Sequence, residues 1–384
     1  MTEKLYDYDS HATEFEATVL KCEKCGDVYK TELDKTLFFP EEGGQCSDVG
    51  MIDGVEIIHA ELCSDTIYHI SKEPLSVGKR VKGSINFKVR FRNMQNHSGE
   101  HIICGIAHRL YGYENVGFHL GETMVTMDLS GELTDDDIRK IERLANEAVV
   151  KNMPVSAFYP TDEELASMDF RAKGEIDARV RVVTIGDVDS CACCAPHVKF
   201  TGEIGIIKIV DAMRHRGGMR LSILCGFDAL ADYNQSCNSS LRISNMLSVK
   251  QEEIADGVQK VLDDMNALRQ SLSEKTKQLA MLSANNAEPS DGNICIFCDD
   301  ADSDSLRLVA NIIKDKTPAI AVVLSGNDED GYRYVMAMAK GEISQAVKDA
   351  NASLNGRGGG KETMASGRFG ATQEKIKNYF STLI

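Results

Sequence analysis

Two short segments of the chain each carry a pair of residues of the types that bind metals. The segment "NHSGEH" at 96–101 holds His97 and His101, and the segment "CCAPH" at 193–197 holds Cys193 and His197. On a helix, positions i and i+4 project from one face about one turn apart, so both histidines can reach one ion. A Cys-x-x-x-His turn can supply two further ligands from the facing side. One cysteine with three histidines is a donor set that suits zinc.

Each pair also has a structural interpretation. His97 and His101 could be surface histidines with satisfied hydrogen bonds, and Cys193 and Cys194 could be small buried hydrophobic residues. For either pair alone this interpretation is favoured. The presence of both pairs in one α/β segment favours a shared metal site.

The segments around the ligands predict the elements that position them. Helical periodicity begins near residue 95, and "TDDDIRKIERLANEAVVKN" predicts a helix with Thr134 as its N-cap. The strand-like "DARVRVVTIGD" at 177–187 leads into the cysteine cluster, and "GEIGIIKIVDAMRHRGGMRLSILCG" predicts a pair of hairpin strands. The ligands are therefore expected in a mixed α/β core.

Different patterns flank this core on both sides. Residues 13–90 contain short β segments, the last of them "GSINFKVR", and predict a small β-barrel or sandwich. From Asn245 to about Ser283, apolar residues at near-heptad spacing predict a long amphipathic arm, a helical hairpin or coiled coil. The remaining residues alternate strands and helices, with "GRGGGKETMASGRF" as a glycine-rich loop. We expect an α/β (α+β) chain with four parts: a β-barrel-like domain at 1–92, the zinc-containing core at 93–240, the helical arm at 241–287 and a C-terminal α/β domain at 288–384.

Composition limits the class of protein. With 384 residues, 42% of them hydrophobic, the chain is expected to form several domains. No segment has the pattern of a signal peptide or a membrane span, so we expect a soluble cytoplasmic protein whose twelve cysteines are reduced. The net charge of −16 argues against broad nucleic-acid affinity. Two local basic clusters remain, at Lys199, Lys208, Arg214, Arg216 and Arg220, and at Arg357, Lys361, Arg368, Lys375 and Lys377.

Four motifs together resemble one family. The segments "TLFFPEEGGQCSDVG" at 36–50, "NHSGEHI" at 96–102 and "CCAPHVKFTGEIGIIKI" at 193–209 occur in the order, and near the spacing, of the motifs of the alanyl-tRNA synthetase editing domain and its freestanding relatives. The segment "GRGGGKETMASGRF" resembles the glycine-rich motif of the synthetases' C-terminal domain. The resemblance covers nearly the whole chain and implies a long freestanding alanyl-tRNA editing protein. Because the chain begins at the β segment that precedes editing, we expect no charging of tRNA.

The resemblance also implies roles for individual residues. His97, His101, Cys193 and His197 match the zinc ligands, and Gln45 matches the editing-site glutamine, which we expect to face the aminoacyl group. Pro196 stands where the family commonly has Thr. Glu100, about 60° from His97 on the helix, is either a proton acceptor or a solvated or structural carboxylate. Cys104 and His108 share the ligand face of the helix and are expected to line or pack the site.

The implied activity is hydrolysis of the ester bond that joins serine or glycine to mischarged tRNA(Ala). Such errors arise because a synthetase pocket that accepts alanine cannot strongly exclude either amino acid. Serine is the expected substrate, and Zn²⁺ would act directly or by positioning. Homodimerisation is expected through the arm and C-terminal domain. The alternative is a catalytically inert, zinc-stabilised tRNA-binding or synthetase-associated module. The residues expected to contact RNA are Arg214, Arg216, Arg357, Gly358, Gly359, Lys361 and Arg368.

Two further cysteine pairs have weaker patterns. Cys22 and Cys25 form a C-x-x-C without a second pair at zinc-ribbon spacing, so reduced thiols at a hairpin are favoured over a second metal site. Cys295 and Cys298 lie in an apolar strand, where core packing is favoured over redox chemistry.

Overall fold

The structure is a computed structural model that describes residues 1–121, 124–172 and 180–382. It separates into two compact units, Met1–Ser239 and Ser240–Ile384. Helices and several sheets occur together, which confirms the mixed α/β class. Among the residues described, no helix is both long and apolar enough to cross a membrane.

The first unit begins with a closed barrel of strand order β2-β3-β7-β6-β5-β8, in which β8 pairs with β2. Alternate barrel residues such as Val19, Leu33 and Ile57 point inward and are fully or almost fully buried. The elements are β1 (Glu3–Lys4), a 3-10 turn (Leu5–Asp7), β2 (Glu14–Cys25), β3 (Val28–Leu33), β4 (Lys35–Thr36), β5 (Gly50–Ile52), β6 (Val55–Cys63), β7 (Thr66–Ser71) and β8 (Arg80–Ile85).

The junction after the barrel corrects the sequence prediction for "GSINFKVR". Strand β8 ends at Ile85, and helix α1 (Phe87–Tyr111) begins where the strand was expected to continue. The side chain of Asn86 accepts a hydrogen bond from the Val89 backbone N–H at 3.4 Å and caps the helix. An N-cap of this kind satisfies a backbone donor that the first helical turn leaves open. Helix α1 therefore starts about two turns before residue 95.

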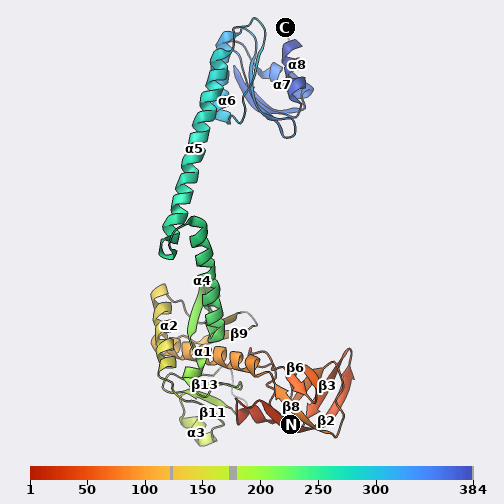
Figure 1. The fold of residues 1–384 in the computed structure, drawn as a ribbon, viewed down its shortest axis with the longest axis vertical. Helices are drawn as coiled ribbons and strands as arrows, with labels where there is room; N and C mark the ends of the chain where they lie inside the picture. The colour runs from red at the N-terminus through yellow and green to blue at the C-terminus, as the bar shows by residue number, and fades with distance from the viewer. Residues whose placement is uncertain (122–123, 173–179, 383–384) are drawn as a thin grey trace. The chain divides into compact units, whose positions relative to one another are not determined.

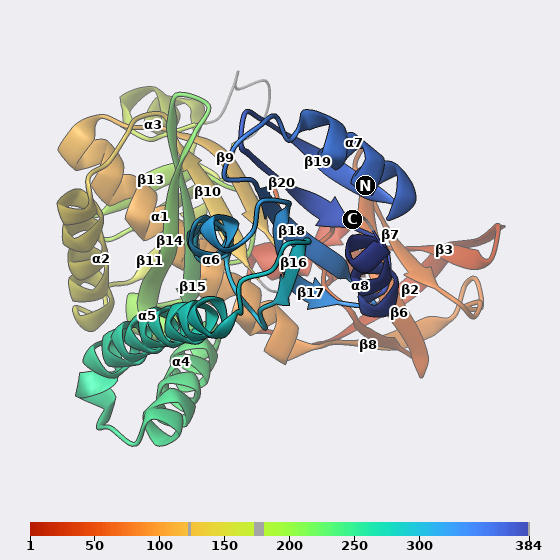
Figure 2. The ribbon, with the colours of Figure 1, turned by 90° about the horizontal axis from the view of Figure 1, so that it is seen from above.

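The rest of the first unit surrounds α1 (Figures 1 and 2). One sheet has the order β14-β15-β10-β9 and a second has the order β11-β12-β13. The predicted helix at Thr134 is confirmed, with a capping box between Thr134 and Asp137. The elements are β9 (Asn115–Leu120), β10 (Val125–Leu129), α2 (Asp135–Val150), β11 (Val155–Phe158), α3 (Asp162–Ser167), β12 (Val182–Ile185), β13 (Asp189–Ala192), a 3-10 turn (Thr201–Ile204), β14 (Ile207–His215), β15 (Gly218–Cys225) and α4 (Phe227–Leu247).

Two strand predictions of this unit have different outcomes. The hairpin predicted after the ligands is confirmed, because β14 and β15 pair antiparallel from Ile207↔Cys225 to His215↔Gly218. The strand predicted at 177–187 is observed from Val182 to Ile185, while its first residues, 177–179, lie outside the described part of the chain.

The second unit contains a long helix and a five-stranded sheet of order β16-β17-β18-β20-β19 (Figure 2). Helices α5 and α6 pack on it through buried alanines and aliphatic residues such as Ala284, Leu306 and Val309. The elements are a 3-10 turn (Gln251–Glu253), α5 (Ile254–Asn286), β16 (Ile294–Phe297), α6 (Ser303–Ile313), a 3-10 turn (Lys314–Lys316), β17 (Ala321–Asn327), β18 (Gly331–Ala337), α7 (Ser344–Ser353), β19 (Gly356–Lys361), β20 (Met364–Phe369) and α8 (Gln373–Thr382).

Two sequence predictions for this unit need correction. The helical pattern from Asn245 onward is interrupted, because α4 ends at Leu247 and α5 begins at Ile254. Ser248, with a φ of 55°, turns the backbone out of α4. The predicted glycine-rich loop is the strand pair β19–β20, with Gly358 opposite Gly367. A Cβ at Gly358 would lie 2.6 Å from the Tyr334 hydroxyl, so glycine is what lets this strand approach its neighbours.

Candidate metal centre

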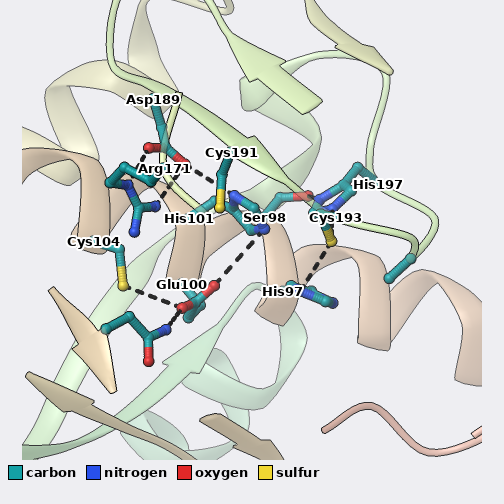
Figure 3. Close-up of polar contacts among 12 residues, drawn as sticks. His97, Ser98, Glu100, His101, Cys104, Arg171, Asp189, Cys191, Cys193 and His197 are labelled. Atoms are coloured by element: carbon teal, nitrogen blue, oxygen red, sulfur yellow. Dashed lines mark hydrogen bonds and ion pairs between the residues drawn. The ribbon is translucent and has the colours of Figure 1, made fainter. Parts of the chain in front are cut away.

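Four of the predicted ligands meet in one place. His97 and His101 project from α1, and Cys193 and His197 lie on the segment after β13 (Figure 3). One ligand atom from each of the four lies within 4.8 Å of all the others. The Cys193 Sγ is 3.6 Å from His97 Nε2 and 3.3 Å from His197 Nε2. The spacing of each pair therefore brings its members together, as the i, i+4 pattern predicts for a helix.

Each of the three imidazoles forms a hydrogen bond through its Nδ1 atom. His97 Nδ1 is 2.7 Å from Gln45 Oε1, His101 Nδ1 is 2.9 Å from Asp189 Oδ2, and His197 Nδ1 is 3.0 Å from Ser98 Oγ. A partner at one ring nitrogen fixes the orientation of the ring and leaves the other nitrogen as the ligand atom. All three Nε2 atoms are thereby left for the centre of the cluster.

A second layer of charge supports His101 (Figure 3). The Arg171 guanidinium donates to both oxygens of Asp189, with Nε 2.8 Å from Oδ1 and a terminal nitrogen 2.9 Å from Oδ2. Asp189 is nearly fully buried, so this bidentate pair compensates the cost of burying its charge. Cys191 lies close to His101 and Asp189 and forms a second group of metal-type side chains with them.

The electrostatics suit a thiolate bound together with imidazoles. Burial opposes ionisation of Cys193, but the neighbouring His97 and His197 outweigh burial and hold the pKa of this thiol well below its usual value. Burial lowers the pKa of His197 to about 3. Burial also acts to lower the pKa of His101, but the hydrogen bond with Asp189 reverses the effect and raises it well above its usual value. Zinc binds a thiolate and neutral imidazoles, so the pKa shifts of Cys193 and His197 favour binding, whereas His101, whose raised pKa favours the cation, would release its Nε2 proton on binding.

A cavity of about 820 Å³ opens onto the cluster. A cavity of this size can hold a small ligand or the end of a larger one. Its lining includes three of the four cluster residues, the carboxylates of Glu42 and Glu100, and the cationic side chains of Lys4, Arg171 and Arg181. Polar and charged walls beside the metal-type side chains are suited to a polar ligand.

Gln45 reaches α1 from a tight turn. Glu42 and Gln45 exchange two backbone hydrogen bonds, of 3.2 and 3.0 Å, across Gly43 and Gly44. Both glycines have positive φ, 63° and 84°, and a Cβ at Gly44 would lie 2.5 Å from the Phe118 carbonyl oxygen. Gln45 is fully buried, and its Oε1 is the atom that contacts His97. Its expected contact with an aminoacyl group is thus joined by an observed contact with a predicted ligand.

Glu100 is buried, which excludes the solvated alternative for its carboxylate. Its Oε1 accepts hydrogen bonds from the Cys104 thiol and the Asn115 amide, and its Oε2 lies 3.9 Å from His101 Nε2. Cys104 is also fully buried, in agreement with a packing role. His108 lies outside the cluster, where its half-exposed ring pairs with Glu114 at 2.9 Å.

Two family models match separate parts of the chain. The threonyl and alanyl tRNA synthetase second additional domain matches residues 180–261, and the DHHA1 domain matches residues 291–383. Among curated proteins, the chain is 26% identical to the alanyl-tRNA editing protein AlaX-L of Pyrococcus horikoshii over 98% of this chain and 96% of that protein. It is 27% identical to the alanyl-tRNA editing protein Aarsd1 of Rattus norvegicus over 97% of each chain. The chain is therefore similar to alanyl-tRNA editing proteins over nearly its whole length.

These freestanding relatives are matched over nearly their full length, and their names agree with the expectation of an editing hydrolase. The alanine–tRNA ligase of Methanobrevibacter smithii is 30% identical over 95% of this chain but only 44% of its own length. Among solved structures, the C-Ala domain of the Aquifex aeolicus synthetase covers 25% of this chain and 97% of its own at 20% identity, with a TM-score of 0.22. That score is too low to establish a common fold.

Sequence reasoning missed several residues of this candidate metal centre. Ser98 and Asp189 hold two of the imidazoles, and Arg171 holds Asp189. The pairs that hold His101 and His197 are separated by 88 and 99 positions along the chain. Only the position of Ser98, one residue after His97 within the ligand motif, offered a local signal.

The residues expected to contact RNA lie on or beside two strand pairs, β14–β15 in the first unit and β19–β20 in the second. Arg214 is strongly exposed near the end of β14 and pairs with Glu132 at 3.1 Å, and Arg216 lies in the following turn. In the second unit, Arg357 and Lys361 are exposed on β19, and Arg357 stands opposite Arg368 of β20. Gly358 and Gly359 lie between Arg357 and Lys361 on the same edge strand.

Cys22 is half-buried and Cys25 is exposed on the β2–β3 hairpin.

Proposed function

We propose that this protein is a zinc-containing trans-editing hydrolase that deacylates mischarged tRNA(Ala), with Ser-tRNA(Ala) as its main substrate and Gly-tRNA(Ala) as a second. The observation that carries the proposal is the set of three imidazoles, each held through Nδ1, with Nε2 turned toward Cys193 beside a cavity of about 820 Å³. The names of full-length relatives, which are alanyl-tRNA editing proteins, support the choice of tRNA(Ala).

His97, His101, Cys193 and His197 would hold the zinc. One thiolate and three imidazoles form a complete tetrahedral set, and the observed backing bonds are those that metal-bound histidines need. When bound, zinc would polarise or position the serine ester. Because four protein side chains complete the set, positioning is the role that this donor set favours.

The chain's own residues would orient the ester and accept its protons. Gln45 fixes the ring of His97, and its buried Nε2 has no hydrogen-bond partner among the described residues, so it remains available as a donor to the aminoacyl group. Glu100 faces the cavity with its Oε2 while Oε1 is held by Asn115 and Cys104. Glu100 is therefore our candidate acceptor for the proton of the attacking water.

Serine is favoured as the substrate for a physical reason. A site with polar groups placed for the serine hydroxyl would leave those groups unpaired when alanine is bound. Such an arrangement discriminates by roughly 10⁴-fold or more, whereas a purely apolar pocket gives only about 10- to 200-fold. Correctly charged Ala-tRNA(Ala) would therefore survive.

The second unit supports a role in tRNA binding and dimerisation. Arg357 on the edge strand β19 and Arg368 on the neighbouring strand β20 form a directly opposed, exposed pair that phosphates can reach. Helix α5 leaves several large apolar side chains exposed, which suits association with a second copy: Val258, Val261, Leu262, Leu268, Leu272, Leu279 and Leu282.

The deciding assay incubates the metal-replete protein with Ser-tRNA(Ala), Gly-tRNA(Ala) and Ala-tRNA(Ala) and follows loss of the ester. We expect rapid hydrolysis of the seryl ester and almost none of the alanyl ester, and the rate for the glycyl ester measures whether the site also accepts a smaller substrate that lacks the hydroxyl. A Gln45→Ala variant should be slower and keep its zinc. Failure of the metal-replete protein to hydrolyse any mischarged ester would leave the inert tRNA-binding module as the better description.

A further inference from the structure

The turn that carries Gln45 leaves a second polar atom open. Glu42 and Gln45 face each other across the turn as an antiparallel bridge. Directly opposed residues of such a pair project to the same side. The Oε2 atom of Glu42 is buried and has no hydrogen-bond partner within the described residues. A buried carboxylate oxygen without a partner is costly, and a ligand that supplies a donor would remove this cost.

Among the described residues, no cationic side chain forms an ion pair with Glu42. Burial, the nearby Cys193 and Glu42 together raise the pKa of the Cys194 thiol. Lys4 also lines the cavity, but among the residues that the structure describes it forms no ion pair with Glu42 within 4.0 Å. Glu42 itself lines the same cavity as His97, His101 and Cys193. Glu42 therefore presents to this cavity a carboxylate oxygen that has no partner among the described residues, near the cluster of metal-type side chains.

We propose that Glu42 binds the α-ammonium group of the aminoacyl ester, a role that rests on the function proposed above. An aminoacyl-tRNA carries this cation on the carbon next to the ester carbonyl, so a carboxylate at the edge of the cluster can fix both the charge and the position of the bond to be cut. A charge-assisted hydrogen bond of this type is stronger and more directional than a neutral one. Glu42 is thus a positioning residue that selects free aminoacyl esters against esters whose nitrogen is acylated or absent.

The test compares two esters that differ only at this group. Seryl-tRNA(Ala) has the ammonium group. Its 2-hydroxy analogue, the glyceric acid ester of tRNA(Ala) (here the glyceryl ester), has a hydroxyl in the same place. In the Glu42→Gln variant we expect kcat/KM for the seryl ester to fall by about 10- to 100-fold, the usual range for loss of a hydrogen bond to a charged group. For the glyceryl ester we expect a change below about 3-fold. Zinc content and thermal unfolding should match the unmodified protein.

Glu41→Gln is the matched control, because it removes the same charge one residue earlier from a side chain that is mostly exposed and pairs only loosely with His59, at 3.7 Å. This variant should retain the seryl preference. An equal loss for both esters in Glu42→Gln, or no loss for either, would overturn the role of Glu42. Absence of seryl hydrolysis by the unmodified protein would instead overturn the proposed deacylase function.

Discussion

The two units of the protein differ in whether their charged side chains are buried or exposed. Within the described residues of the first unit, charged and histidine side chains are buried in pairs, as in Arg90 with Asp48 and His101 with Asp189. In the second unit the buried polar side chains are hydroxyl groups, those of Ser244, Ser305, Thr317 and Ser325. Its arginines and lysines lie on the surface.

This difference separates two kinds of binding. Buried charges need exact partners, because an unpaired charge in the interior costs several kcal/mol, so each such group in the first unit depends on one or two named neighbours. Surface charges are screened by salt and act additively, so the second unit can hold a polyanion without a unique geometry. We expect substitutions to have large, specific effects in the first unit and small, graded effects in the second.

The largest effect should come from the cluster itself. Replacement of Cys193 or His197 by Ala should abolish stoichiometric zinc and lower the free energy of unfolding by several kcal/mol, because structural zinc contributes binding energy on the order of 10 kcal/mol. Elemental analysis and thermal unfolding measure both effects. Cys194→Ala is the neighbouring control and should keep its zinc. Full zinc in both ligand variants would mean that the ligands are misassigned.

The barrel offers a titration that is independent of the metal. His69 is completely buried, 2.8 Å from the Thr36 hydroxyl and 3.1 Å from the Thr31 carbonyl oxygen, and burial lowers its pKa to about 4. The unfolded chain takes up the proton near pH 6.5, so stability is fully present above that pH and is lost as the pH falls toward 4. The loss should reach about 3 kcal/mol.

Chemical unfolding of the first unit between pH 4 and 7 measures this dependence. The His69→Gln variant should show a flatter profile than the unmodified protein over this range, whereas a His108→Gln variant, changed at a half-exposed ring, should follow the unmodified profile. Identical profiles for His69→Gln and the unmodified protein would show that burial of this ring carries no pH dependence.

A smaller effect on zinc affinity is expected at Asp189, which contacts the predicted ligand His101. Asp189→Asn removes the charge that holds His101 and receives Arg171, and such supporting partners usually change metal affinity by about 10- to 100-fold. Competition with a zinc chelator gives the affinity. Asp187→Asn, an exposed carboxylate two residues earlier, is the control. Equal zinc affinity in the two variants would remove Asp189 from the site.

The smallest effect should be in the second unit. Replacing Arg357 and Arg368 together by Ala should weaken tRNA binding and lower the slope of log affinity against log salt by about 0.7 to 0.9 for each phosphate that is no longer neutralised. Zinc content should not change. Arg307→Ala, on the exposed side of α6 beside Asp304, is the control. An unchanged salt slope in the double variant would assign the edge strand to a different partner.

The sequence predicted the elements whose signals are local. The capping box at Thr134 and Asp137 joins residues three positions apart, and the ligand pairs on α1 and after β13 each span four. The strand expected at "GSINFKVR" was wrong beyond Ile85, because β-branched and aromatic residues favour strands while the Asn86 cap and packing on the core favour helix. Gly356–Lys361 was expected to be a loop because glycine disfavours strands. The segment is a strand because it pairs with β20, and the close approach of the Tyr334 hydroxyl requires glycine at position 358.

The sequence by itself determined which residues could bind a metal, since their type and short spacing suffice for that, and four of its motifs resemble those of alanyl-tRNA editing proteins. Only the tertiary structure decided how those residues are held. Gln45, Ser98 and Asp189 meet their histidines across 52 to 99 positions of chain, and Glu42 faces the cavity because of a turn closed by two glycines. Contacts between distant segments depend on how the barrel, α1 and the strands pack together, and no local pattern of residue types encodes that packing.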